Sequence, residues 1–204
     1  MITNKDIIPL FPEAVLYATT LDVNSNEILN FCKKSSFNFT ESSLEELCNC
    51  YASKDFKVFD KLNDLKNKIE EHIKYYLFEI FKYKIDYKFL NSWITKVDVN
   101  GYSQPHTHNN TLLSGVYYPV GDKNFKIKFI KKDQGFFDID ANESNSYNCR
   151  YMIMDILHNN TLILFPSSLK HNIEKNKSNT ERYSIAFNIN PKGVIGTGDS
   201  KVYF

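Results

Sequence analysis

The sequence has almost no excess of charge of either sign. Its 204 residues carry 25 Lys and Arg against 24 Asp and Glu, a formal net charge of +1. Such a balance gives no reason to expect binding to nucleic acid or to an anionic membrane surface. No stretch approaches the ~20 consecutive apolar residues of a membrane-spanning helix. With 42% hydrophobic residues, the composition is that of a globular domain rather than a disordered chain.

Cysteine is scarce, and its spacing forms no motif. The four cysteines are Cys32, Cys48, Cys50 and Cys149, and no C-x-x-C pair occurs. This spacing fits neither a zinc site nor a compact disulfide framework, so we expect reduced thiols. The first six residues lack the basic start and long apolar core of a signal peptide. A cytoplasmic location is therefore expected.

The first ninety residues are predicted to hold an edge strand followed by helices. Apolar runs broken by proline in residues 7–21 indicate a strand at the edge of a sheet. Residues 26–31 and 43–52 are candidate short helices, the second because Ser43 and Glu45 supply a cap and an acidic first turn. Apolar residues at intervals of three and four predict one long amphipathic helix over residues 59–81.

After residue 87 the hydrophobic period changes from helical to alternating. Strands are predicted over residues 93–99, 113–120, 124–130, 151–156, 161–165 and 182–189. Turn-forming residues, not helices, separate them. Helices followed by a run of short strands predict an α+β protein with an antiparallel sandwich or barrel. We expect a single domain over residues 1–204.

Polar residues capable of chemistry gather on these strands. His106 and His108 lie two positions apart, so both side chains can face one interior point if the segment is a strand. His171 follows the apolar strand 161–165, and Arg182 and Ser184 share one face of the last strand. A guanidinium and a hydroxyl that point together into a barrel are suited to bind a carboxylate.

Four segments in this order resemble a known family. They are QPHTH at 104–108, LSGVYY at 113–118, LFPSSLKH at 164–171 and ERYSIAFN at 181–188. The combination resembles the iron(II)/2-oxoglutarate-dependent oxygenases, and more narrowly a group from marine bacteria and phages related at a distance to prolyl 4-hydroxylases. The resemblance implies a double-stranded β-helix over residues 87–190. Residues 1–86 would then give a strand and helices packed on one sheet, and residues 191–204 a tail.

The resemblance also implies roles for single residues. His106 and His171 take the places of the two metal-binding histidines. Arg182 takes the place of the arginine that holds the far carboxylate of 2-oxoglutarate, with Ser184 and Tyr118 beside it. His108 stands where the wider superfamily has Asp or Glu. We therefore expect a metal site of three neutral imidazoles, which leaves iron(II) with one more positive charge than the usual two histidines and one carboxylate.

The implied activity is that of a dioxygenase that uses Fe(II), 2-oxoglutarate and O₂. It would hydroxylate a peptide or protein side chain, or a small molecule, and release succinate and CO₂. Val116, Leu162 and Leu164 are expected to form an apolar lining for the site. The protein would act in the cytoplasm, or in the host cytoplasm if a phage encodes it.

Two other functions are compatible with the same residues. One is a cupin-type three-histidine dioxygenase that works without 2-oxoglutarate, although such an enzyme has no need for Arg182 on the last strand. The other is a non-catalytic β-helix module for structure or binding. A buried arginine with no anion to bind would be costly to keep in such a module.

Overall fold

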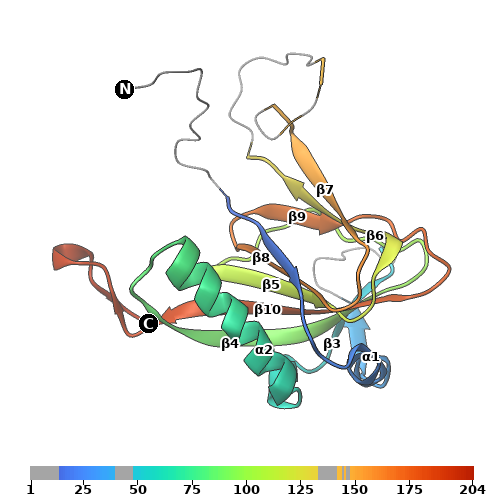
Figure 1. The fold of residues 1–204 in the computed structure, drawn as a ribbon, viewed down its shortest axis with the longest axis horizontal. Coiled ribbons are helices and arrows are strands. Elements are labelled where there is room, and N and C mark those ends of the chain that lie inside the picture. Colours follow the sequence, from blue (N-terminus) through green and yellow to red (C-terminus); the bar gives the residue numbers. More distant parts are fainter. Residues whose placement is uncertain (1–13, 40–47, 133–141, 144, 146–147) are drawn as a thin grey trace.

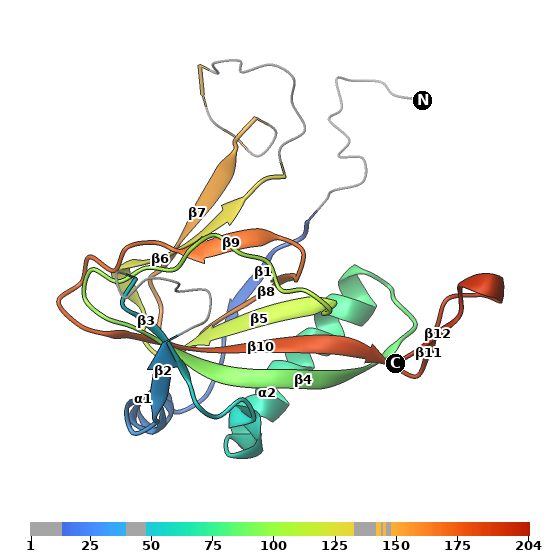
Figure 2. The ribbon, with the colours of Figure 1, turned by 180° about the vertical axis from the view of Figure 1, so that it is seen from behind.

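The computed structural model describes residues 14–39, 48–132, 142–143, 145 and 148–204, and its centre is a pair of antiparallel sheets (Figure 1). The large sheet contains, in spatial order, β1 (Tyr17–Thr20), β8 (Thr161–Pro166), β5 (Leu113–Tyr118), β10 (Arg182–Lys192), β4 (Asp86–Val97), β3 (Cys50–Ser53) and β2 (Phe37–Phe39). The small sheet contains β7 (Tyr151–Ile156), β6 (Asp122–Ile130) and β9 (Lys170–Ile173). A short hairpin of β11 (Val194–Ile195) and β12 (Val202–Tyr203) follows β10 (Figure 2).

The two sheets pack face to face through apolar side chains. Val116 and Phe165 of the large sheet share a buried cluster with Phe125, Ile127 and Phe129 of the small sheet. This arrangement of two antiparallel sheets around one interior is a double-stranded β-helix, so the predicted fold class is confirmed.

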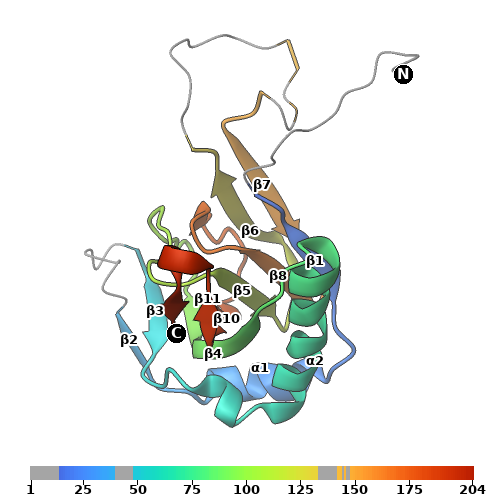
Figure 3. The ribbon, with the colours of Figure 1, turned by 90° about the vertical axis from the view of Figure 1, so that its left-hand side faces the viewer.

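Helices cover the outer face of the large sheet, as expected (Figure 3). α1 (Ser25–Lys33) begins at Asn24, whose side chain accepts a hydrogen bond from the backbone N–H of Glu27. α2 (Asn63–Lys74) turns its buried residues toward the sheet. None of the helices in the described part of the chain is long and apolar enough to cross a membrane.

The single long helix predicted over residues 59–81 is interrupted. A 3₁₀ turn, η1 (Val58–Asp60), precedes α2, and a π-helical turn, η2 (Tyr75–Ile80), continues it. The apolar side chains of all three pieces still reach the same core. The hydrophobic pattern therefore located the buried face correctly but did not show where the backbone changes its hydrogen bonding.

The helix predicted over residues 43–52 is wrong at its C-terminal end. Residues 43–47 lie outside the described part of the chain, but Cys50–Ser53 is strand β3, which pairs with β2 and β4. Asn49 has a φ of 45°, a left-handed conformation that Asn tolerates at a turn. Pairing with two neighbouring strands outweighs the local capping signal. The predicted edge strand is confirmed for Tyr17–Thr20, which pairs with β8.

The side chains of β10 alternate as predicted. Tyr183, Ile185 and Phe187 face the helices, and Arg182 and Ser184 face the interior between the sheets. Gly115 of β5 lies directly under the ring of Phe187, where a Cβ atom would collide with that ring. The last strand therefore presents one apolar face to the helical layer and one polar face to the site.

Candidate metal centre and co-substrate site

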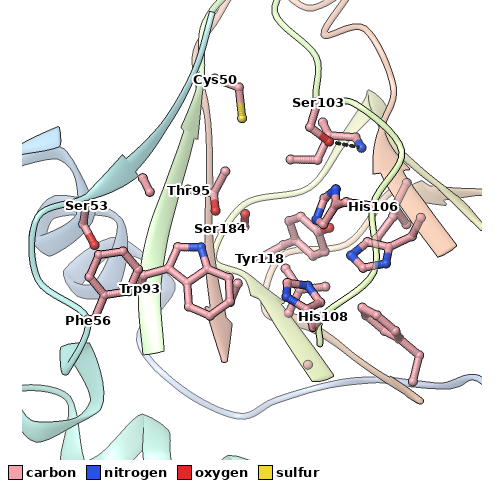
Figure 4. A pocket seen from close by; sticks show the side chains of 18 of the residues that line it. Cys50, Ser53, Phe56, Trp93, Thr95, Ser103, His106, His108, Tyr118 and Ser184 are labelled. Carbon is pink, nitrogen blue, oxygen red and sulfur yellow. Dashed lines mark hydrogen bonds between the residues drawn. The ribbon is translucent and has the colours of Figure 1, made fainter. Parts of the chain in front are cut away.

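Three histidines converge at one end of the interior between the sheets. His106, His108 and His171 each offer a ring nitrogen, and these nitrogens all lie within 4.8 Å of one another. The ring centroids of His106 and His171 are 4.5 Å apart, and each lies 5.2 Å from that of His108 (Figure 4). Within the described residues, this is the one group of potential ligands compact enough to hold a metal ion.

Backbone pairing brings the histidines together. His106 and His171 form an isolated antiparallel bridge in which each backbone N–H donates to the other's carbonyl at 2.9 Å. The backbone N–H of His108 donates to the carbonyl of Ser167 in the loop between β8 and β9. The two-residue spacing had suggested that His108 lies on a regular strand, but it lies in a loop. The pairing of His106 with His171 and the hydrogen bond from His108 to Ser167 hold this loop, so the His108 ring faces the other two rings.

Hydrogen bonds orient two of the rings. Nδ1 of His106 lies 2.8 Å from the carbonyl oxygen of Gln104, and Nδ1 of His171 lies 2.9 Å from that of Leu169. A carbonyl oxygen can only accept, so the proton sits on Nδ1 and the lone pair on Nε2. Histidines that bind metals are commonly fixed in this way by a second hydrogen bond. The donor set therefore fits a divalent metal ion.

Burial keeps the imidazoles of His108 and His171 neutral. Loss of solvent, together with the neighbouring His106, lowers the pKa of His108 to about 4 and that of His171 to about 3. A neutral imidazole has the free lone pair that coordination requires. Cys50 also lines the interior, but burial raises the pKa of its thiol to about 12, so it is not a thiolate ligand at neutral pH.

Asp98 and Asp122 do not belong to the histidine group. Asp98 pairs with Lys96 at 3.0 Å, and Asp122 accepts hydrogen bonds from the backbone and side chain of Asn124. His158 is exposed in a turn and does not belong to the group either. The predicted set of three histidines without a carboxylate is thus the set that the fold brings together.

Arg182 is buried inside the protein with no acidic partner among the described residues. Only 1% of its surface is exposed. It donates to the hydroxyl of Tyr118 and to the carbonyl of Lys126, both at 2.8 Å, and its guanidinium carbon lies 4.8 Å from the centre of the Tyr118 ring. The N–H at Nε has no hydrogen-bond partner among the residues that the structure describes. A buried cation in this state is costly unless an anion completes it.

Tyr118 connects Arg182 to the cavity that contains the histidines. The cavity has a volume of about 590 Å³, and Tyr118 and Ser184 line it together with the three histidines. Arg182 itself lies one layer behind Tyr118 rather than on the cavity wall. Burial raises the pKa of the Tyr118 hydroxyl, and Arg182 partly offsets this shift, so the hydroxyl stays protonated at neutral pH. The cavity thus brings the three histidines together with a neutral hydroxyl that is backed by a buried guanidinium.

The expected apolar lining is only partly correct. Val116 lines the cavity, but Leu162 and Leu164 belong to the core on the opposite, helix-covered face of the large sheet. Phe165 and Ile127 take their place in the cavity wall. The strand register explains the difference, because Leu164 lies opposite Gly115, whose outward side faces Phe187 and the helical layer.

The sequence did not reveal several cavity residues. Thr95 follows Trp93 by two positions on β4, so the alternation of that strand could have found it. Phe56 comes from the segment after β3, and no sequence pattern connects it to the histidines.

A chain of buried hydrogen bonds lies behind the cavity. The side-chain oxygen of Asn188 accepts a hydrogen bond from the hydroxyl of Ser114, which is also hydrogen-bonded to the hydroxyl of Ser167 at 2.8 Å. These hydrogen bonds support the loop between β8 and β9, in which the carbonyl of Ser167 accepts from the backbone N–H of His108.

The comparisons with known proteins agree with this geometry. Residues 91–188, just under half of the chain, match the family described as "Putative 2OG-Fe(II) oxygenase". The matched range contains every residue of the proposed metal and co-substrate site. Among proteins with curated descriptions, none matches the sequence.

Solved structures share the fold at low sequence identity. A prolyl-4-hydroxylase from Pseudomonas putida is 10% identical over 87% of this chain and 93% of its own, with a TM-score of 0.57. HygX from Streptomyces hygroscopicus, crystallised with nickel and 2-oxoglutarate, is 10% identical over 86% and 82%, with a TM-score of 0.57. The viral collagen prolyl hydroxylase from Paramecium Bursaria Chlorella virus-1, in its 2-oxoglutarate complex, is 10% identical over 85% and 94%, with a TM-score of 0.51.

The fold and the histidine cluster define a double-stranded β-helix whose interior holds three histidines that could bind a metal ion. The family match adds the chemistry: over residues 91–188 the chain is similar to the iron(II)/2-oxoglutarate-dependent oxygenases. It is an enzyme whose cofactor is Fe(II) and whose co-substrate is 2-oxoglutarate.

Proposed function

We propose that His106, His108 and His171 hold Fe(II) and that Arg182, with Tyr118 and Ser184, binds the distal carboxylate of 2-oxoglutarate. The observation that carries this assignment is the buried guanidinium of Arg182, which has no acidic partner among the described residues and an unsatisfied Nε. A carboxylate is the ligand that a planar guanidinium fork and a hydroxyl bind best. The two groups that accept hydrogen bonds from Arg182, the backbone carbonyl of Lys126 and the hydroxyl of Tyr118, are both uncharged.

The chain's residues have three tasks in this reaction. The histidines hold the metal on one side and leave the cavity side open. Arg182 and Tyr118 fix one end of the co-substrate, so that its other end lies toward the histidines. Val116, Ile127 and Phe165 exclude water from the reacting atoms. When bound, iron and 2-oxoglutarate activate O₂, one oxygen atom of which enters a C–H bond of the substrate while the other leaves in succinate, with release of CO₂.

The proposed reaction is the hydroxylation of a peptide or protein side chain or of a small molecule. A net charge of +1 does not favour nucleic acid as a partner. All four cysteines are free, which supports a cytoplasmic location because thiols stay reduced there.

The variant His108→Asp tests the metal assignment. Its carboxylate would create the face of two histidines and one carboxylate that non-haem iron(II) oxygenases use. We therefore expect His108→Asp to keep iron binding within about tenfold of the parent and to keep 2-oxoglutarate consumption, whereas His108→Ala loses about a hundredfold in iron affinity. The measurements are anaerobic iron titration and succinate release.

The fold of each variant is checked by circular dichroism, and His158→Ala serves as the matched control because His158 is exposed. Folded His108→Asp protein without iron, or His108→Ala protein with undiminished affinity, would show that His108 is not a ligand.

A further inference from the structure

The cavity extends beyond the histidines across the floor of the large sheet. Ser184, Thr95, Ala52 and Asn38 are direct register partners on four adjacent strands, β10, β4, β3 and β2. All four line the cavity. With a spacing of about 4.8 Å between strands, this row is about 14 Å long. Because 2-oxoglutarate has its proposed anchor at the Arg182 end, the outer part of the row over β4, β3 and β2 is left for another molecule.

Two aromatic rings form one wall of this outer part. Trp93 lies 5.7 Å from His108 between ring centroids, and Phe56 lies 6.2 Å from Trp93 (Figure 4). Phe56 is 50% exposed, whereas the residues of the strands beside it are mostly buried. Exposed aromatic surface inside a cavity is a common contact for flat apolar groups. Trp93 lies between Phe56 and His108, so this aromatic surface reaches the histidines.

A threonine hydroxyl also belongs to the floor of the cavity. Thr95 lines the cavity, and 8% of its surface is exposed. Buried hydroxyls are nearly always satisfied by protein, water or ligand. The Thr95 hydroxyl opens into the cavity beside Trp93, so a molecule that lies on the ring can bond to it (Figure 4).

The described lining carries no fixed charge. Apart from the histidines, its members are apolar side chains, hydroxyls, one amide and the Cys50 thiol. A charged group placed here would lose its hydration without a counter-ion, which is unfavourable. An uncharged group has no such cost.

We propose that the outer part of the cavity binds the substrate through an uncharged ring that lies against Trp93 and Phe56, with a polar group of the same molecule hydrogen-bonded to Thr95. This inference rests on the proposed function, because it takes the histidine end as the reacting centre. It names the class of substrate: a molecule or side chain with a neutral aromatic ring next to the C–H bond that reacts.

The single tryptophan makes the proposal measurable without turnover. Trp93 is the only tryptophan in the sequence, so its fluorescence reports on this wall alone. The full chain is loaded with Zn(II), which is redox-inactive, and with 2-oxoglutarate. It is then titrated with N-acetyl-L-phenylalaninamide, benzamide, N-acetylglycinamide, N-acetyl-L-lysinamide and N-acetyl-L-aspartic acid amide. We expect saturable changes in Trp93 emission with one or both of the ring probes, and none with the ringless or charged probes.

Two variants connect the signal to the proposed contacts. Phe56→Ala should weaken the ring probe about tenfold, and Thr95→Val, which keeps the shape but removes the hydroxyl, about fivefold. Tyr75→Ala is the matched control, because Tyr75 is also 50% exposed and also contacts another aromatic ring, but lies in η2 on the helical layer. It should change nothing.

Separate titrations of Zn(II) and 2-oxoglutarate distinguish the two proposals. If both bind but no ring probe changes Trp93 emission, if charged or ringless probes act equally well, or if Phe56→Ala binds the ring probe as the parent does, this inference is wrong and the proposed function stands. If Zn(II) or 2-oxoglutarate fails to bind, the proposed function is wrong, and the substrate assignment is overturned with it.

Discussion

Replacing His171 by alanine is expected to remove tight iron binding, with a loss of at least about a hundredfold in affinity. Of the three histidines, His171 is the most buried, at 6% exposed, and its ring is oriented by the Leu169 carbonyl. Without it, His106 and His108 alone would remain, and two imidazoles from one short segment hold a divalent ion weakly. Iron affinity is measured by anaerobic titration of the purified full chain.

The variant must be separated from a damaged fold, because the His171 ring packs 4.7 Å from that of Phe165. His171→Gln fills most of the same space and should also lose the iron, while circular dichroism stays that of the parent. His158→Ala, which changes an exposed turn histidine, should bind iron as the parent does. Parental affinity in folded His171→Ala and His171→Gln would mean that His171 is not a ligand.

Replacing Arg182 by alanine should weaken 2-oxoglutarate binding by roughly ten- to a hundredfold. Charge-assisted hydrogen bonds to a carboxylate contribute about 1.5–3 kcal/mol. Iron affinity should hardly change, because Arg182 lies behind Tyr118 and not among the histidines. Arg182→Lys should lose less, since it keeps the charge but not the planar fork. The dissociation constant is measured by calorimetry on Zn(II)-loaded protein.

A control cation separates this local effect from a change in overall charge. Lys88 is exposed on β4, and Lys88→Ala removes one positive charge far from the cavity wall. It should bind 2-oxoglutarate as the parent does. If folded Arg182→Ala keeps the parental dissociation constant, Arg182 does not bind the co-substrate, and the three histidines would fit a metalloenzyme that works without it.

The sequence predicted the polar face of the site well because polar residues interrupt its apolar pattern. On β10, Arg182 and Ser184 alternate with large apolar residues, and this alternation assigned both faces correctly. Arg182 and Ser184 each have an apolar neighbour on the strand, so the period of two was unambiguous there.

The prediction failed where the pattern carried no contrast. Residues 162–165 of β8 are apolar and buried on both faces, so nothing in the sequence showed that Leu162 and Leu164 face the helices. The segment before Cys50 carried local helix signals, but its strand is fixed by pairing with β2 and β4, which are distant contacts. Phe56 reaches the cavity for the same reason, through tertiary structure alone.

The most direct test of the account is an anaerobic titration of the iron(II)-loaded full chain with 2-oxoglutarate, followed by visible absorption. If the three histidines hold iron and Arg182 positions 2-oxoglutarate so that it chelates the metal, a metal-to-ligand charge-transfer band should grow and saturate in proportion to the protein. Iron that is demonstrably bound, with no such band at saturating 2-oxoglutarate, would contradict the assignment and favour a three-histidine metal site that does not use this co-substrate.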